Sequence, residues 1–358
     1  MRLRLATVLA LAGALAVGLG ASAQGALPSD FYGVSPATDV NSADADKMGG
    51  GGVDVVRLPM VWRGIEKQED VLTWEDFDAE VRNAANRGMR VQPFVIGTPS
   101  WIEPNNSMRP PLDTQHARDE WQQFLRAAVN RYGPGGAFWT EDPNGPLPPG
   151  PPNRVLAFKA WQLWNEQNSP THWGPEPNPG DYDKLVKLSS SAIRSRDGGA
   201  RIVLGGMFGT PGRPTAIHSD RFLARLYKVP KIERAFDDAA LHPYAPSMRG
   251  VRFQFEIARR AMKRAGDGGT GIRVTEIGWA TDGPAGSPQV VSRSKQAALL
   301  RDSFRLMLDR RAAWNVKQIV WYTWRDHDAP CEWCHSAGLF NEQLEPKPSW
   351  NAYKGFAR

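Results

Sequence analysis

Short apolar runs rich in β-branched residues alternate with longer amphipathic runs along the chain. The short runs predict eight strands, over residues 31–34, 53–58, 90–96, 157–163, 201–204, 239–241, 272–275 and 318–322. Between them, apolar residues recur with the period of a helix that buries one face, as at Trp121, Phe124, Leu125, Ala128 and Val129. Strands that each precede a helix are typical of β/α units repeated around a parallel sheet.

The helix predicted after the second strand is preceded by residues with the spacing of an N-terminal cap. Thr73 precedes Asp76 by three residues, which is the spacing of a capping box, and the apolar positions Phe77, Val81 and Ala84 follow. The sequence therefore predicts a helix that begins here, with the Thr73 side chain as its cap.

Two architectures fit this order of elements, a closed barrel and an open doubly wound sheet. Closure buries every strand on both faces and leaves no sheet edge exposed. A nucleotide-binding doubly wound sheet has a G-x-G-x-x-G turn directly after its first strand, whereas Gly33 is followed by Val34-Ser35-Pro36-Ala37. The glycines at 49–52 precede the second strand, where a tight turn explains them. We expect an α/β fold, a single (β/α)8 TIM barrel.

The N-terminus resembles a secretory signal peptide over residues 1–23. Arg2 and Arg4 precede an apolar run over residues 5–19, and Ala21-Ser22-Ala23 offers small residues for cleavage. The apolar run is shorter than the roughly 20 residues of a membrane-spanning helix, so we expect no stable membrane insertion. Residues 24–358 are expected to form one barrel domain, secreted to the extracellular space or the periplasm. The Pro- and Gly-rich stretch 142–153 is expected to be a loop of this barrel rather than a linker.

Composition and charge exclude some classes of protein. The 358 residues are 41% hydrophobic and 23% charged, a mixture that predicts a folded globular chain. The net charge is +6, and removing Arg2 and Arg4 leaves 42 Lys and Arg against 38 Asp and Glu, an excess of four. This excess is small and interspersed with acids, so no nucleic-acid partner is expected.

Two glutamates stand where a barrel carries its chemistry, at the C-terminal ends of strands. Glu166 follows the fourth strand and Glu276 ends the seventh. Because burying an unpaired carboxylate costs several kcal/mol, such an acid has a chemical role or a matched cation, for which Arg57 is a candidate beside Glu276. Two carboxylates that face each other across the barrel mouth suit cleavage of a glycosidic bond by double displacement, which needs an ionised nucleophile and an acid with a raised pKa.

The residues around both glutamates resemble the motifs of the retaining glycoside hydrolases of clan A. Trp164-Asn165-Glu166 is similar to the clan's motif at the acid/base glutamate, and Thr275-Glu276-Ile277-Gly278-Trp279 is similar to its nucleophile motif. The segment Thr98-Pro99-Ser100-Trp101 looks closer to family 39 than to family 5, whose histidine after the third strand is missing here. Gln167 also departs from the pattern, since a proline commonly follows the acid/base glutamate.

This resemblance implies a β-glycosidase, β-xylosidase-like or endoglucanase-like, that acts on an oligo- or polysaccharide with Glu166 as acid/base and Glu276 as nucleophile. The residues implied to contact the substrate or support the nucleophile are Arg57, Trp101, Asn165, His242, Tyr244, Trp321 and Trp324. Among these, Trp321 or Trp324 is expected to form the floor under the sugar ring. No cofactor or metal is expected. A barrel that binds glycans without cleaving them is the alternative, and the sequence leaves the oligomeric state open.

Tryptophans are frequent after the predicted strand ends, where flat rings can cover the apolar faces of sugars. About half of them are expected to pack in the core instead. The eight tryptophans in such positions are Trp62, Trp101, Trp164, Trp173, Trp279, Trp321, Trp324 and Trp333.

The only two cysteines lie in a C-x-x-C-H motif after the eighth strand, Cys331-Glu332-Trp333-Cys334-His335. This spacing matches covalent attachment of a c-type haem, and two reduced thiols or a short disulfide are the other readings. Export is compatible with haem attachment as well as with a disulfide. The following segments Gly338-Leu339-Phe340 and Pro346-Lys347-Pro348-Ser349-Trp350 resemble those that end many clan A barrels, so we expect Cys331 and Cys334 to be bonded to each other.

Overall fold

The structure is a computed structural model that describes residues 26–141, 156–209, 214–328, 331 and 333–357. The expected signal peptide and the stretch 142–153 lie outside the described residues.

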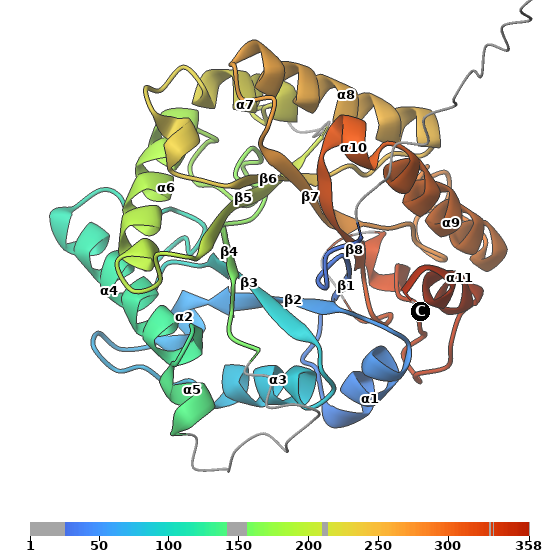
Figure 1. The fold of residues 1–358 in the computed structure, drawn as a ribbon, viewed down its shortest axis with the longest axis horizontal. Coiled ribbons are helices and arrows are strands. Elements are labelled where there is room, and N and C mark those ends of the chain that lie inside the picture. The colour runs from blue at the N-terminus through green and yellow to red at the C-terminus, as the bar shows by residue number, and fades with distance from the viewer. Residues whose placement is uncertain (1–25, 142–155, 210–213, 329–330, 332, 358) are drawn as a thin grey trace, which may run out of the picture.

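Eight parallel strands close into a barrel in sequence order (Figure 1). The strands are β1 (Tyr32–Ser35), β2 (Val55–Val61), β3 (Arg90–Ile96), β4 (Ala160–Leu163), β5 (Arg201–Phe208), β6 (Asp238–His242), β7 (Gly271–Ile277) and β8 (Val316–Tyr322). β1 pairs with both β2 and β8, and this double pairing closes the ring. Each predicted strand overlaps one observed strand, and the predicted (β/α)8 barrel is confirmed.

Helices surround the barrel, as Figure 1 shows. They are α1 (Ser42–Gly50), α2 (Trp62–Ile65), α3 (Glu75–Ala85), α4 (Gln115–Tyr132), α5 (Ala137–Thr140), α6 (Pro179–Arg194), α7 (Ser219–Leu226), α8 (Met248–Arg264), α9 (Arg293–Asp309), α10 (Arg311–Trp314) and α11 (Pro348–Ala357), with 3-10 turns at Ile232–Arg234 and Cys334–Ser336. α4 buries the predicted apolar face, including Trp121, Phe124 and Leu125.

The predicted cap of α3 is wrong. Trp74 occupies the cap position of this helix, and no side chain there accepts a hydrogen bond from the first turn. The Thr73 hydroxyl instead donates to the carbonyl of Ile65, 2.9 Å away, and so holds the preceding loop against the end of α2.

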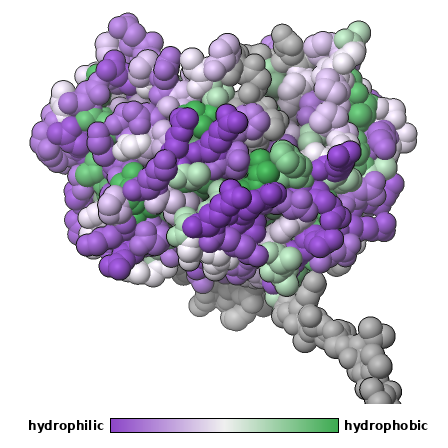
Figure 2. Space-filling view, turned by 90° about the horizontal axis from the view of Figure 1, so that it is seen from above, coloured by the Kyte–Doolittle hydropathy of each residue, from purple (hydrophilic) through white to green (hydrophobic). Residues whose placement is uncertain are grey.

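The outer surface is largely hydrophilic on the face shown in Figure 2, where hydrophobic side chains are scattered. Across the described ranges, the large hydrophobic side chains that stay exposed are those of Leu27, Val71 and Phe253. None of the helices described above is both long enough and apolar enough to span a bilayer.

Candidate active site

A pocket of about 520 Å³ opens where the strands end. Five of the predicted catalytic and substrate-binding residues contribute to its wall: Arg57, Asn165, Glu166, Tyr244 and Glu276. They come from β2, the turn after β4, the segment after β6, and β7. The barrel thus brings together side chains that lie up to 219 positions apart in sequence.

Glu276 is held by a cation on one oxygen and by a phenol on the other. Arg57 Nη1 lies 2.7 Å from Oε1, and the Tyr244 hydroxyl donates to Oε2 over 2.9 Å. Burial, followed by the negative charge of Glu276, raises the pKa of Tyr244 well above its ordinary value, so Tyr244 stays protonated as a donor. Both carboxylate oxygens of Glu276 are thus held by a strong hydrogen-bond donor.

Glu166 is presented by a tight turn after β4. Trp164 and Glu166 both have positive φ, at 69° and 44°, a region that costs a non-glycine residue energy. The turn is fixed by its neighbours in the barrel, since the Trp164 N–H donates to Val95 O and the Glu166 N–H donates to Gly206 O. Backbone bonds to β3 and β5 therefore aim the Glu166 side chain into the pocket.

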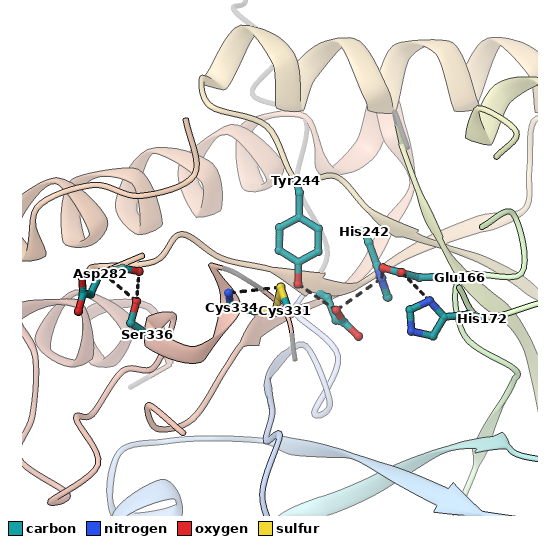
Figure 3. Close-up of a disulfide and its surroundings, with 9 residues drawn as sticks. Glu166, His172, His242, Tyr244, Asp282, Cys331, Cys334 and Ser336 are labelled. Carbon is teal, nitrogen blue, oxygen red and sulfur yellow. Dashed lines mark hydrogen bonds and ion pairs between the residues drawn. A yellow bond between two sulfur atoms is a disulfide. The ribbon is translucent and has the colours of Figure 1, made fainter. Parts of the chain in front are cut away.

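Two histidines flank the carboxylate of Glu166, one on each oxygen (Figure 3). His242 Nδ1 lies 2.9 Å from Oε1 and His172 Nδ1 lies 3.1 Å from Oε2. His242 Nδ1 is also 3.5 Å from Glu276 Oε2, so this ring lies between the two carboxylates. One oxygen each of Glu166 and Glu276 lie within 4.8 Å of one another.

These contacts determine the pKa of Glu166. Burial is the largest single influence and raises it, but the hydrogen bonds and charges of His172 and His242 together outweigh burial, and the pKa of Glu166 lies well below the usual range of a glutamate. The sequence-based expectation of a raised pKa at the acid glutamate is therefore not met in this arrangement. The structure instead pairs this carboxylate with groups that can hold its proton.

Close approach to His242 explains a glycine in β5. A Cβ atom at Gly206 would lie 1.9 Å from His242 Nε2, far inside contact distance. The neighbouring Gly205 is similarly close to the Gln167 side chain, where a Cβ would lie 2.1 Å from Oε1. Two adjacent glycines thus make room for the histidine and for the residue after Glu166.

The tryptophan predictions need correction. Trp321 is fully buried and its Nε1 donates to Ala337 O, while Trp324 is 1% exposed and its Nε1 donates to Asp44 Oδ1. Trp101 is half-buried, donates to Glu66 O, and is not part of the pocket wall. None of these three rings forms the floor of the pocket. Of the eight tryptophans after strand ends, Trp333 is the one that lines it, so the share that packs elsewhere exceeds the expected half.

Other aromatic residues take the expected place of Trp321 and Trp324. Tyr322 lines the pocket, as do Phe208 and Trp333, and the Trp333 ring meets Tyr244 edge-on with centroids 5.1 Å apart. Cys331 and Cys334 form the expected disulfide, which also lines the pocket. Sequence reasoning missed Tyr322 and His172. The position of His172, six residues after Glu166 in the same loop, is the signal that was available.

The carboxylates and His242 also have the spacing of a metal site. Glu166, His242 and Glu276 each offer one ligand atom, all within 4.8 Å of one another. However, Arg57 already places a positive charge 2.7 Å from Glu276 Oε1, and a second cation beside that oxygen would be repelled. The charge arrangement therefore fits a neutral substrate better than a metal ion.

No family model matches the chain, and no curated protein matches it. Solved structures do share its fold. A family 39 glycoside hydrolase from Bacteroides cellulosilyticus WH2 is 20% identical, with 92% of this chain and 64% of that chain covered and a TM-score of 0.65. A monomeric beta-xylosidase from Caulobacter crescentus CB15 is 18% identical, with 90% and 67% covered and a TM-score of 0.63. Xylanase 10B from Thermotoga petrophila RKU-1 is 14% identical, with 92% and 94% covered and a TM-score of 0.61.

At sequence identities of 14–20%, these structures show that the fold is shared. They confirm that the chain shares the barrel of the clan A glycoside hydrolases, as the motif resemblance implied. The chain spans 64% of the length of the family 39 structure.

Proposed function

We propose that the protein is a secreted retaining glycoside hydrolase that cleaves β-glycosidic bonds, with Glu276 as nucleophile and Glu166 as acid/base. The observation that carries this proposal is the short separation of the two carboxylates, whose nearest oxygens lie within 4.8 Å. Retaining enzymes hold their carboxyl groups about 5–5.5 Å apart, whereas inverting enzymes leave about 6.5–9.5 Å for a water molecule. The fold shared with known glycosidases supports the same assignment.

In the first step, a carboxylate oxygen of Glu276 attacks the anomeric carbon. The bond to the leaving oxygen breaks, its electron pair stays with that oxygen, and Glu166 supplies the proton that neutralises it. In the second step, Glu166 takes a proton from water, the water oxygen bonds to the anomeric carbon, and the ester bond to Glu276 breaks. Both protein groups return to their starting state.

The surrounding side chains support these roles. Arg57 and Tyr244 each contact one oxygen of Glu276 and so fix its orientation. Arg57 Nη2 donates to Asn165 Oδ1 over 2.7 Å, which leaves the Asn165 amide nitrogen to donate to a sugar hydroxyl. Phe208 and Trp333 add apolar surface on which the faces of a pyranose can pack.

Azide rescue tests both assignments. We expect Glu276→Ala to abolish hydrolysis of an aryl β-glycoside, and azide to restore turnover by entering from the vacated face and giving the α-glycosyl azide. Glu166→Ala should instead give the β-glycosyl azide, because azide then attacks the glycosyl-enzyme intermediate. NMR of the products distinguishes the anomers, and circular dichroism checks that both variants fold.

The substrate panel should include aryl β-xylosides, β-glucosides and β-mannosides together with plant and microbial polysaccharides. Near-normal activity of Glu276→Ala would show that the nucleophile is misassigned. Sugar binding by the wild type without any turnover across the panel would favour the alternative, a barrel that binds glycans without cleaving them.

A further inference from the structure

His172 lies in the active site, yet the mechanism above gives it no role. Its Nδ1 is 3.1 Å from Glu166 Oε2, and Figure 3 shows the ring pointing at the carboxylate from the loop after β4. The His172 side chain is 30% exposed, whereas that of Glu166 is 13% exposed. An imidazole in contact with both solvent and a buried carboxylate can exchange protons with each of them.

We propose that His172 shares the catalytic proton with Glu166, so that the acid/base of this site is a carboxyl–imidazole pair and not a carboxyl group alone. The proposal rests on the proposed function, because it assumes that Glu166 is the acid/base. His172 acts here as a positioning and proton-holding residue.

His242 is the other histidine on Glu166, and its surroundings differ. Its side chain is fully buried, and both ring nitrogens are engaged, Nδ1 with Glu166 Oε1 and Nε2 with the Thr275 hydroxyl at 3.0 Å. A neutral ring that donates at Nδ1 and accepts the Thr275 hydroxyl at Nε2 satisfies all of these contacts. The buried His242 therefore positions the carboxylates, and the solvent-facing His172 is the one suited to gain and lose a proton.

The charges that face Glu166 lead to the same assignment. The groups around it are His172 from its own loop, His242 from β6, Glu276 from β7 with Tyr244 beside it, Tyr322 from β8, and Arg57 from β2. Arg57 balances the charge of Glu276. A proton on His172, whose Nδ1 lies 3.1 Å from Glu166 Oε2, would balance the charge of an ionised Glu166 in the same way.

Proton transfer within the pair completes the first chemical step. As the glycosidic oxygen takes up negative charge, the proton on His172 Nδ1 moves to the Glu166 carboxylate, and Glu166 gives a proton to that oxygen. One proton leaves the pair in this step. The proton that Glu166 takes from water in the second step restores the pair, so the cycle needs no external acid.

The dependence of kcat/KM on pH distinguishes a His172 that shares the catalytic proton from a His172 that only holds Glu166 in place. The substrate should be an alkyl β-glycoside, whose poor leaving group needs protonation. In the wild type, activity should decline on the alkaline side above about pH 6.5, in the imidazole range. His172→Asn keeps an N–H donor but cannot titrate, and His172→Phe removes both properties. If the pair shares the proton, both variants should lose activity at a pH at least one unit lower, since the proton then resides on Glu166 alone.

A merely structural His172 predicts a different pattern. His172→Asn would leave the alkaline limb in place, and His172→Phe would move it to higher pH because a donor to the carboxylate is lost; either result overturns the proposal. His116→Asn is the matched control, because His116 Nε2 also lies 3.1 Å from a carboxylate, that of Glu69, but outside the pocket. It should leave the pH profile unchanged.

A second measurement does not depend on activity. The His172 ring can be titrated by NMR in the wild type and in Glu166→Gln. We expect the pKa of His172 to fall by at least one unit in Glu166→Gln, because the neighbouring negative charge is removed. An equal pKa in both proteins would overturn the proposal even if the protein proves to hydrolyse a different bond, so its failure can be told apart from failure of the proposed function.

Discussion

Arg57 is fully buried and contacts both Glu276 and Asn165, the residue that precedes Glu166. Its Nε donates to Gln162 Oε1 at 2.8 Å, its Nη1 contacts Glu276 and Ser35, and its Nη2 donates to Asn165. A planar guanidinium can serve all of these acceptors at once, whereas a lysine presents a single ammonium group at the end of a flexible chain. The planar geometry of the Arg57 guanidinium group is therefore as important for holding these residues as its positive charge.

Arg57→Lys tests that distinction. It keeps the positive charge near Glu276 but loses most of the fixed contacts, so we expect kcat/KM to fall by about 10²-fold or more, roughly 2.7 kcal/mol of transition-state stabilisation. Kinetics on the best substrate of the panel measures this. Arg260→Lys, at an exposed position on α8, is the control and should be neutral. A loss of less than twofold at Arg57 would show that charge alone is sufficient.

Individual residues show where sequence reasoning succeeds and where it stops. The motifs identified Glu166, Glu276 and Arg57, because polar residues at the ends of apolar strands are unusual. They placed Trp321 in the site and missed Tyr322, since adjacent side chains on a strand point to opposite faces and a one-residue shift reverses their roles. His172 was missed because its contact with Glu166 depends on the conformation of the loop after β4, which the sequence pattern does not reveal.

Elements were predictable where periodicity is strong. All eight strands were found because each is a short apolar run between turn signals. Their ends were less certain, as in the fourth strand, predicted over 157–163 and observed over Ala160–Leu163. The cap of α3 was predicted wrongly because the spacing of Thr73 and Asp76 does not reveal that the Thr73 hydroxyl bonds to Ile65. The turn that presents Glu166 depends on backbone bonds to β3 and β5, which sequence spacing does not encode.

Helix α4 offers a direct test of capping in this fold. The Thr114 side chain accepts a hydrogen bond from the Ala117 N–H over 3.0 Å. Thr114→Ala leaves that donor without its partner, and we expect the free energy of unfolding to fall by about 1 kcal/mol. Thr114→Ser keeps the hydroxyl and should be nearly neutral. Equilibrium denaturation in urea measures both variants, and equal losses in the two would mean that the hydroxyl bond is not the cause.

At the scale of the whole molecule, closure of the barrel is what assembles the site. Arg57 and Glu276 lie in β2 and β7, and Glu166 lies in the turn after β4. These three residues are far apart in sequence, and they meet because β1 joins β2 on one side and β8 on the other. The count of β/α units predicted this closure. The wall of the pocket was not predictable in the same way, because it is built by loops such as the one that carries Trp333 and the disulfide.

Gly33 lies where the ring closes, paired with Val55 of β2 and Val320 of β8. A Cβ atom there would lie 2.6 Å from Val55 Cγ1, 2.8 Å from the Val55 carbonyl oxygen and 3.1 Å from Val320 Cγ2. Because one of these contacts is with backbone, a side-chain rotation cannot relieve it. A methyl group at this position must push β1 away from its neighbours on both sides.

We therefore expect Gly33→Ala to destabilise the barrel by about 1–3 kcal/mol, with a fall in Tm of several degrees. Gly355→Ala is the matched control, since a Cβ at Gly355 meets nothing within 4 Å and alanine favours the helix α11. Thermal unfolding followed by circular dichroism compares the two variants with the wild type. Equal stability of Gly33→Ala and Gly355→Ala would contradict the tight packing of β1 against β2 and β8, and with it the closure on which the spacing of Glu166 and Glu276 depends.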